Sequence, residues 1–272
     1  MMNTSGELVV VRIIAPNPGP MTGTGTNSFI VGDDTGCIVI DPGVTDADHL
    51  DALLTASYVL GGMTAVVVTH GHPDHVSGAL ELATIAEVPL LAYDNTQSGV
   101  PTATKLVADG DAITAGQQSL QILTTPGHRF DHICLWHAAT GILFAGDLVA
   151  GSGSVVIIPP EGDMRDYLES LARVQTLPLQ RIWPGHGEAI DQPHELLTHY
   201  IQHRLDREAQ VLAALTATPQ TVKQLVPTVY ADTPPAMYDW AGLSLLAHLL
   251  KLEHEGRATR SSGTDRTEYW HG

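Results

Sequence analysis

The sequence predicts a layered α/β fold with its helices outside the sheets, followed by a small helical unit. Over the first two hundred residues, short runs rich in Val and Ile alternate with helical patterns, and Gly, Pro, Asp or Asn separates them. From about Arg204 onward, short helical patterns take the place of strands. The chain has 272 residues, 43% apolar and 16% charged, so it can build a hydrophobic core, and wholesale disorder is excluded.

Nine apolar segments are the expected strands, because β-branched residues are concentrated in them and turn residues flank them. They are residues 8–14, 28–31, 37–40, 65–68, 89–92, 120–123, 133–137, 142–144 and 181–183. Four helical patterns accompany them, at residues 46–55, 75–85, 166–175 and 193–217. In the third pattern, Leu168, Leu171 and Ala172 recur at the 3.6-residue spacing of a surface helix.

Three short helices and a hairpin are expected in the C-terminal region. The helices are residues 206–216, 221–226 with Thr221 as N-cap, and 239–255 with a leucine-rich face. The polar tail after Gly256 is the expected hairpin. This combination is typical of a winged-helix unit, so the expected domains are residues 1–203 and 204–272.

Negative charge is concentrated in the first domain. The net charge of the chain is −17, and residues 204–272, with seven basic and eight acidic residues, contribute only −1. The remaining −16 repels phosphate chains. An aromatic fraction of 5% also leaves few side chains for stacking on bases. Both observations disfavour a nucleic-acid partner.

Several other classes of protein are excluded or disfavoured. Cys37 and Cys134 both lie in apolar runs and are expected to be buried thiols, which excludes a disulfide scaffold or a cysteine-rich metal cluster. The sequence has no Gly-x-Gly-x-x-Gly or P-loop motif. No apolar run approaches the roughly 18 residues of a membrane span, and no signal peptide is recognisable. We expect a cytoplasmic protein with no membrane partner.

Histidine is the unusual component, with 14 residues against 13 for Lys and Arg together. The segment Thr69-His70-Gly71-His72-Pro73-Asp74-His75 directly follows the expected strand 65–68. His70 and His72 are two residues apart in an extended segment, so they point the same way and can bind one ion. Asp74 and His75 open the next helix and can face a second ion.

Three further donors follow expected strands in the same way. A small or turn-forming residue ends each strand, and then His128, Asp147 or His186 appears. Each of them alone would be explained equally well as a turn residue or a hydrogen-bonded histidine. In α/β folds, however, ligands gather beyond the carboxyl ends of strands. Four strand ends of this kind predict one shared metal site.

The pattern Thr69-His70-x-His72-x-Asp74-His75-x-x-Gly78 resembles the signature of the metallo-β-lactamase superfamily, with His128, Asp147 and His186 at its later motifs. The similarity spans about residues 8–200. Residues 25–27, 160–164, 230–234 and 244–249 resemble the lactamase-beta-like protein 2 group, which adds a C-terminal winged helix. The resemblance implies a four-layer αβ/βα sandwich with the ligand loops along one edge.

The resemblance also implies a binuclear centre. His70, His72 and His128 would hold one metal, Asp74, His75 and His186 the other, and Asp147 would bridge both. Asp41 resembles a buried Asp that supports the ligand loop, although an ordinary turn residue is the alternative. Since no Cys is among the ligands, two Zn²⁺ ions are expected, with Mn²⁺ or Fe²⁺ as alternatives. Arg129 replaces the small polar residue of many relatives, and it either contacts an anionic substrate or pairs with Asp131.

Metal-dependent hydrolysis is the expected activity. Two cations about 3.5–4 Å apart make hydroxide available near neutral pH, and Asp74 would orient it or take its proton. We expect a small acyl substrate of the thioester, lactone or β-lactam type, in a short apolar cleft lined by Phe130, Trp136 or Tyr167.

Three other functions remain open at this stage. Mammalian members of the subgroup imply a metal-dependent endoribonuclease acting on single-stranded RNA, which the charge disfavours. A DNA-binding regulator would use the winged helix, but residues 204–272 carry no basic stripe. A mononuclear iron oxygenase shares the fold in some relatives. We expect the apolar face of residues 239–255 to pack against the rest of the chain, where it would wall one side of the active-site cleft or bury area in a homodimer.

Overall fold

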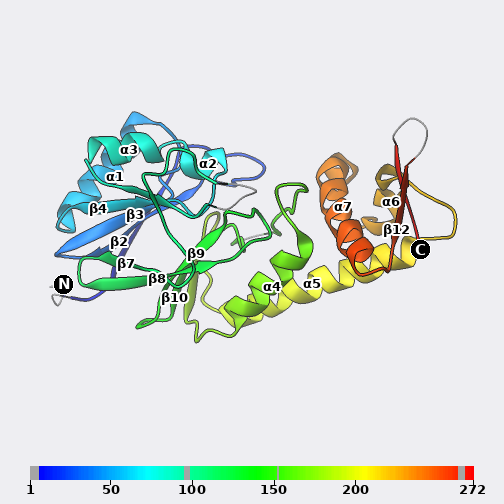
Figure 1. Ribbon diagram of the computed structural model, residues 1–272. Coiled ribbons are helices and arrows are strands. Elements are labelled where there is room, and N and C mark those ends of the chain that lie inside the picture. Colours follow the sequence, from blue (N-terminus) through cyan, green and yellow to red (C-terminus); the bar gives the residue numbers. More distant parts are fainter. Residues whose placement is uncertain (1–5, 95–98, 152, 263–266) are drawn as a thin grey trace.

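Two β-sheets form the centre of the N-terminal part of the molecule (Figure 1). The computed structural model describes residues 6–94, 99–151, 153–262 and 267–272. The first sheet has six strands that lie side by side in chain order, antiparallel up to β3 and parallel beyond it. They are β1 (Val9–Ile14), β2 (Asn27–Asp33), β3 (Gly36–Ile40), β4 (Met63–Val67), β5 (Leu90–Ala92) and β6 (Lys105–Leu106).

The second sheet has five strands in the order β11-β10-β9-β8-β7, and only β10 and β11 are parallel neighbours. Its strands are β7 (Ala112–Ala115), β8 (Gln118–Thr124), β9 (Ile133–His137), β10 (Ile142–Gly146) and β11 (Arg181–Pro184). All nine strands expected from the sequence are present. The short β6 and the edge strand β7 escaped prediction, because two or four residues of mixed polarity carry no clear pattern.

Three apolar cores separate four layers, which confirms the predicted sandwich. Side chains such as Ile38 and Leu135 fill the core between the two sheets. The outer face of the first sheet packs on α1 (Ala47–Val59) and α3 (Ala79–Ile85). The outer face of the second sheet packs on α4 (Met164–Gln175) and α5 (Pro193–Ala214). Cys37 and Cys134 are buried free thiols, as expected.

The predicted helix at residues 75–85 is two helices, α2 (Pro73–Val76) and α3. The helix is interrupted around Gly78. The backbone of Gly78 passes so close to Val44 that an added Cβ would lie 2.6 Å from the Val44 carbonyl oxygen. The Gly78 N–H donates to the carbonyl oxygen of Gly43. This close approach fixes the segment that carries Asp74 and His75 against the end of β3.

The C-terminal unit contains α6 (Val222–Val229), the short 3₁₀ helix η1 (Pro235–Met237), α7 (Tyr238–His254) and a hairpin of β12 (Thr259–Ser262) with β13 (Glu268–His271). Thr221 caps α6, as predicted, in a reciprocal pair of bonds with Gln224. The apolar face of α7 packs against α5 and α6 around Leu245 and Leu249. No helix of the described segments is long and apolar enough to cross a membrane.

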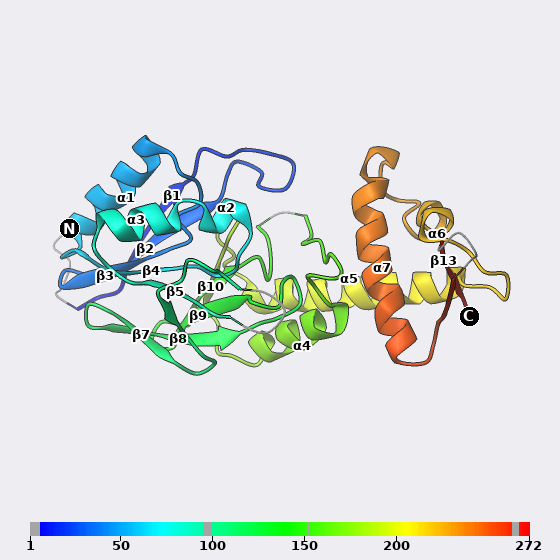
Figure 2. The ribbon, with the colours of Figure 1, turned by 45° about the horizontal axis from the view of Figure 1, so that its top comes forward.

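The helical pattern at residues 193–217 is confirmed as α5. The segment expected as a separate helix, residues 206–216, is its second half, and α5 runs without a break through the expected domain boundary. No Gly or Pro lies in its interior to end it at residue 203, and Arg204 and Arg207 are buried there. Figure 2 shows α5 extending from the part of the molecule that holds the sheets to the C-terminal unit, with α7 crossing it.

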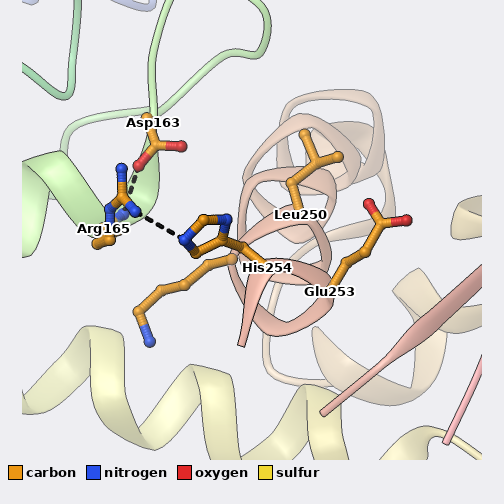
Figure 3. A pocket seen from close by; sticks show the side chains of 6 residues that line it. Asp163, Arg165, Leu250, Glu253 and His254 are labelled. Atoms are coloured by element: carbon orange, nitrogen blue, oxygen red, sulfur yellow. Dashed lines mark hydrogen bonds between the residues drawn. The ribbon is translucent and has the colours of Figure 1, made fainter. Parts of the chain in front are cut away.

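The two units also meet at the start of α4. There, Arg165 donates a hydrogen bond of 2.9 Å to Nε2 of His254 at the end of α7 (Figure 3). These residues, with Asp163, Leu250, Lys251 and Glu253, line a cavity of about 430 Å³. Arg165 lies two residues after Asp163. The Asp163 N–H donates to the carbonyl oxygen of Gly127, and this bond joins the start of α4 to the segment of His128. The C-terminal unit therefore contacts the segment that packs against the loop of His128, one of the predicted metal ligands.

Candidate metal centre

The side chains predicted as metal ligands meet where four strands end. They come from the segments after β4 (His70, His72, Asp74 and His75), β8 (His128), β10 (Asp147) and β11 (His186). Their ligand atoms form two groups, and the atoms of each group lie within 4.8 Å of one another. The two groups adjoin, since the ring centroids of His70 and His75 are 4.2 Å apart. Every residue that the sequence assigned to the centre is brought together.

The first group contains three imidazoles and one carboxylate oxygen. His72 Nδ1 lies 3.0 Å from His70 Nε2 and 3.0 Å from His128 Nε2. His128 Nε2 lies 3.7 Å from Asp147 Oδ2. Three nitrogens and one oxygen thus converge on one point.

The second group contains two imidazoles and two carboxylates. His186 Nε2 lies 3.2 Å from Asp74 Oδ2, 3.3 Å from His75 Nε2 and 3.5 Å from Asp147 Oδ1. His75 Nε2 is in turn 3.6 Å from Asp74 Oδ2 and 3.5 Å from Asp147 Oδ1. Asp147 therefore presents a different oxygen to each group.

These separations fit a bridged pair of divalent cations. Around a tetrahedral Zn²⁺ with bonds of about 2.0–2.1 Å, neighbouring ligand atoms lie about 3.3–3.4 Å apart. The separations given above run from 3.0 to 3.7 Å. A donor set of imidazole nitrogens and carboxylate oxygens without thiolate suits Zn²⁺, Mn²⁺ or Fe²⁺.

Asp41 supports this centre from beneath. The side chain is 2% exposed and lies at a φ of 48°, a left-handed conformation that is uncommon for a residue other than glycine. Its Oδ1 accepts the Thr69 N–H at 2.7 Å, and its Oδ2 accepts the Thr69 hydroxyl at 2.7 Å and His75 Nδ1 at 2.8 Å. Because the Thr69 hydroxyl donates to Asp41, it accepts from His70 Nδ1. Because Nδ1 of each ring is held in this way, Nε2 of His70 is directed to the first group and Nε2 of His75 to the second.

The remaining ligand loops are fixed by backbone contacts. His128 Nδ1 donates to the Val156 carbonyl oxygen at 3.0 Å, which orients Nε2 toward the first group. The Asn27 amide donates to the carbonyl oxygens of Pro184 and Gly187, on either side of His186. A Cβ on Gly185 would lie 2.5 Å from Asp147 Oδ1, so only glycine allows this loop to reach the bridging carboxylate.

Sequence reasoning missed His132, which holds the Asp147 backbone. The ring is fully buried, and its Nε2 accepts the Asp147 N–H at 3.0 Å. Its Nδ1 therefore carries the proton and donates to the Thr125 hydroxyl at 2.8 Å. Burial, with repulsion from His128, lowers the pKa of His132 to about 3, so the ring is neutral. The spacing of four residues between His128 and His132 could have indicated a role at the site. However, His132 does not follow the end of a strand, which was the pattern used to find the ligands.

Burial keeps the imidazoles of the first group neutral. It lowers the pKa of His70 well below the ordinary value and also lowers that of His128. Burial and repulsion from His128 and Arg129 lower the pKa of His72 to about 3. Neutral imidazole is the form that binds a metal, so this group needs no deprotonation before binding.

Carboxylates favour positive charge in the second group. Burial opposes a charged His75, but Asp147 and Asp41 raise its pKa well above the ordinary value. Burial likewise opposes a charged His186, but hydrogen bonds to Asp147 and Asp74 raise its pKa to about 9. Burial would raise the pKa of Asp147, yet His75 and His186 hold it well below its usual range. The carboxylates that stabilise protonated imidazoles here would stabilise a divalent cation in the same way.

Arg129 lies beside the first group and pairs with carboxylates of its own chain. Its Nε donates to Asp131 Oδ1 at 2.8 Å, and Nη1 donates to Glu161 Oε2 at 2.5 Å. Asp131 is buried and also accepts the Gly71 N–H at 3.0 Å. The pairing with Asp131 that the sequence left open is therefore present, and a substrate role for Arg129 stays a prediction.

The expectation that Tyr167 and Trp136 line an apolar cleft is wrong. Tyr167 is fully buried in α4, and its hydroxyl donates to the Leu148 carbonyl oxygen. Trp136 packs against the same core, on the outer face of the second sheet. The period-two alternation of β9 directs Trp136 away from the inter-sheet core that its neighbour Leu135 enters. Phe130 is half-buried on the His128 loop.

Comparison with known families agrees with this geometry. The family described as Metallo-beta-lactamase superfamily matches residues 21–186, which include every candidate ligand. The chain belongs to the metallo-β-lactamase superfamily. A second family, the Beta-lactamase associated winged helix domain, matches residues 221–270 and confirms the predicted winged helix.

Two relatives and one solved structure are similar to this chain. It is 32% identical to a Beta-lactamase-like protein 2 homolog of Drosophila melanogaster, over 96% of this chain and 93% of that one. It is 31% identical to an Atrochrysone carboxyl ACP thioesterase of Aspergillus fumigatus, over 76% of this chain and 64% of that one. A Beta-lactamase domain protein from Burkholderia ambifaria shares the fold, with a TM-score of 0.83 at 21% identity over 100% of this chain and 95% of that one.

Proposed function

We propose that the chain is a binuclear zinc-dependent hydrolase that cleaves a small thioester. The observation that carries the proposal is the position of Asp147, whose Oδ2 faces His128 while Oδ1 faces both His75 and His186. One carboxylate with its oxygens in two ligand groups is suited to a pair of metals held close together. His70, His72 and His128 would hold the first ion, and Asp74, His75 and His186 the second.

Two bound cations would activate a water molecule near neutral pH and stabilise the negative charge that develops on the carbonyl oxygen. Asp74 orients that water by accepting a hydrogen bond. Burial would raise the pKa of Asp74, but the hydrogen bond from His186 and the charge of His75 outweigh it and lower the pKa. A carboxylate with a lowered pKa is a good acceptor but a weak base, so orientation is its main contribution.

A thioester is favoured over RNA for two reasons. The catalytic domain carries a charge of −16, which opposes the approach of a polyanion over a long range. A fungal relative that matches 76% of this chain is named a thioesterase. A small acyl compound requires only the metal pair and a short space beside it, whereas RNA requires an extended cationic path.

The test is an activity panel on purified protein whose metal content has been measured. Thioesters, lactones, β-lactams, phosphodiesters and single-stranded RNA are offered with Zn²⁺, Mn²⁺ or Fe²⁺. We expect two metal ions per chain and thioester turnover that Asp147→Ala abolishes. Asp191→Asn is the matched control, because Asp191 pairs with Arg181 and its side chain is 68% exposed.

Other outcomes would assign a different function. Efficient RNA cleavage that is lost in Asp74→Ala, with sluggish acyl hydrolysis, would identify an endoribonuclease. One iron per chain with oxygen uptake would identify an oxygenase. Tight DNA binding without turnover would identify a regulator.

A further inference from the structure

The guanidinium of Arg129 has one permanent partner and one exchangeable partner. Nε and Nη2 face Asp131, whose side chain is fully buried and also accepts the Gly71 N–H. Nη1 faces Glu161, whose side chain is 58% exposed. Breaking the first contact would leave a buried carboxylate without its cation, which is costly. The second contact involves an exposed carboxylate, which water can solvate once it is released, so breaking that contact costs less.

The exchangeable position lies beside the first metal group. Glu161 Oε2 is 3.9 Å from His72 Nε2, and His72 Nδ1, across the same ring, faces His70 and His128. A carboxylate at this position is thus one imidazole ring away from the ligand atoms. Asp131 also binds the backbone of Gly71, between two candidate ligands, so Arg129 is anchored to the ligand loop itself.

We propose that Glu161 occupies a carboxylate-binding position on Arg129, and that the free carboxylate of an acyl substrate displaces it there. The inference rests on the proposed function and narrows its substrate class. That class is a thioester whose acyl group ends in a carboxylate a few carbons from the thioester carbonyl. Glu161 is then a specificity-determining residue, because every anionic substrate must compete with it, whereas a neutral acyl group need not.

Arg129 retains its charge during the exchange. Asp131 and Glu161 each place one carboxylate against the single guanidinium of Arg129. When the substrate carboxylate replaces Glu161, Arg129 still contacts two carboxylates, and the released Glu161 enters solvent. The exchange therefore requires no proton transfer and no buried unpaired charge.

The kinetic test compares succinyl and butyryl thioesters of N-acetylcysteamine, which differ in a terminal carboxylate against a methyl group. Glu161→Gln should lower KM for the succinyl compound by about fivefold, the effect of removing one exposed competing ion pair. KM for the butyryl compound should be unchanged. Asp191→Asn, which removes the same charge from another exposed pair with arginine, should change neither. Equal changes for both substrates, or loss of bound metal in Glu161→Gln, would overturn the proposal.

A binding test does not depend on turnover. Succinate is titrated into the metal-loaded and metal-free protein while the arginine Nε–H signals are followed by NMR, and Arg129→Lys identifies the Arg129 signal. Succinate should shift that signal at concentrations about fivefold lower in Glu161→Gln than in the unaltered chain. An unresponsive Arg129 signal overturns this inference even if thioesters are hydrolysed. A responsive signal without any thioester hydrolysis removes the proposed function alone.

Discussion

Asp147 is the residue on which both metal groups depend. Its carboxylate is shared between His128 on one side and His75 and His186 on the other, while Asp74 belongs to the second group only. The sequence predicted this division of ligands through the family motif. The physical pattern of a donor after each strand end predicted that the residues meet, but the assignment of each oxygen required the structure.

Asp147→Ala should reduce bound Zn²⁺ from two ions per chain toward none, because neither group keeps its full set of donors. Asp74→Ala should lose mainly the second ion. Elemental analysis of dialysed protein measures both. Retention of two ions and full turnover in Asp147→Ala would show that the carboxylate does not bridge.

His132→Leu removes the only acceptor that the structure gives to the Asp147 N–H. Leaving a buried donor unsatisfied costs about 1–3 kcal/mol, and the bridging carboxylate loses its anchor. We expect weaker binding of both metals by calorimetric titration. His137→Leu is the control, because His137 is also buried, but its ring, among the described residues, bonds to Thr140 within its own turn and not to the Asp147 segment. It should lower stability in denaturant without changing metal affinity.

At the scale of elements, the sequence predicted which segments are strands and helices better than where they end. Periodicity and β-branched residues located β8, β9 and β10 because each has a consistent buried face. The break between α2 and α3 was not predicted, since it results from the close approach of Gly78 to Val44, residues distant in sequence. The pattern at residues 193–217 predicted α5, but not that this helix continues through the expected domain boundary at residue 203. Its charged middle resembles a boundary, but Arg204 and Arg207 turn inward to carbonyl oxygens of other elements.

The packing of α7 on α5 makes stability dependent on pH through His248. This side chain is fully buried, and neither ring nitrogen has a hydrogen-bond partner within the described part of the chain. Burial, with repulsion from Arg204 and Lys251, lowers its pKa to about 3. The unfolded chain, with an ordinary histidine pKa of about 6.5, binds this proton first as the pH falls. The contribution of His248 is therefore complete above about pH 6.5 and decreases between pH 6.5 and 3.

His248→Leu should flatten the loss of stability on the acid side of pH 6.5. Well below that pH, the difference from the unaltered chain should grow by about 1.4 kcal/mol per pH unit. Urea unfolding of metal-free protein between pH 7 and 5 measures it. His194→Leu is the control, because His194 is exposed at the start of α5 and should leave the slope unaltered. If the free energy of unfolding depended on pH equally in His248→Leu and in the unaltered chain, His248 would not cause the loss of stability in acid.

On the scale of the whole molecule, the catalytic and C-terminal units share structural elements. Arg204, near the expected boundary, donates to the carbonyl oxygen of Val155, and the next residue, Val156, accepts the hydrogen bond from His128. Composition and charge predicted that two units exist, and the family matches at residues 21–186 and 221–270 agree. Local patterns could not predict that a ligand of the first unit is supported through a helix leading into the second.

A chain ending after Ile201 should be less soluble than one ending after Ala214. The shorter chain loses the Arg204 contact to Val155, whereas the longer one retains all of α5. We also expect weaker binding of the first metal in the shorter chain, while the ligand residues themselves remain. Soluble yield and zinc titration compare the two. Indistinguishable yield and zinc affinity would show that the second half of α5 is dispensable for the catalytic unit.

The position of Ala247 constrains how the molecule is made. This residue of α7 belongs to the same core as Leu197, Tyr200 and Tyr167, under the second sheet. It lies 63 residues beyond Pro184, the last residue of that sheet. Because a ribosome delivers the chain from its N-terminus, the second sheet emerges long before the residue that completes its covering. On the nascent chain, α4 and α5 cover most of the apolar underside of that sheet, so the part that stays accessible to chaperones until α7 follows is the part beneath Ala247.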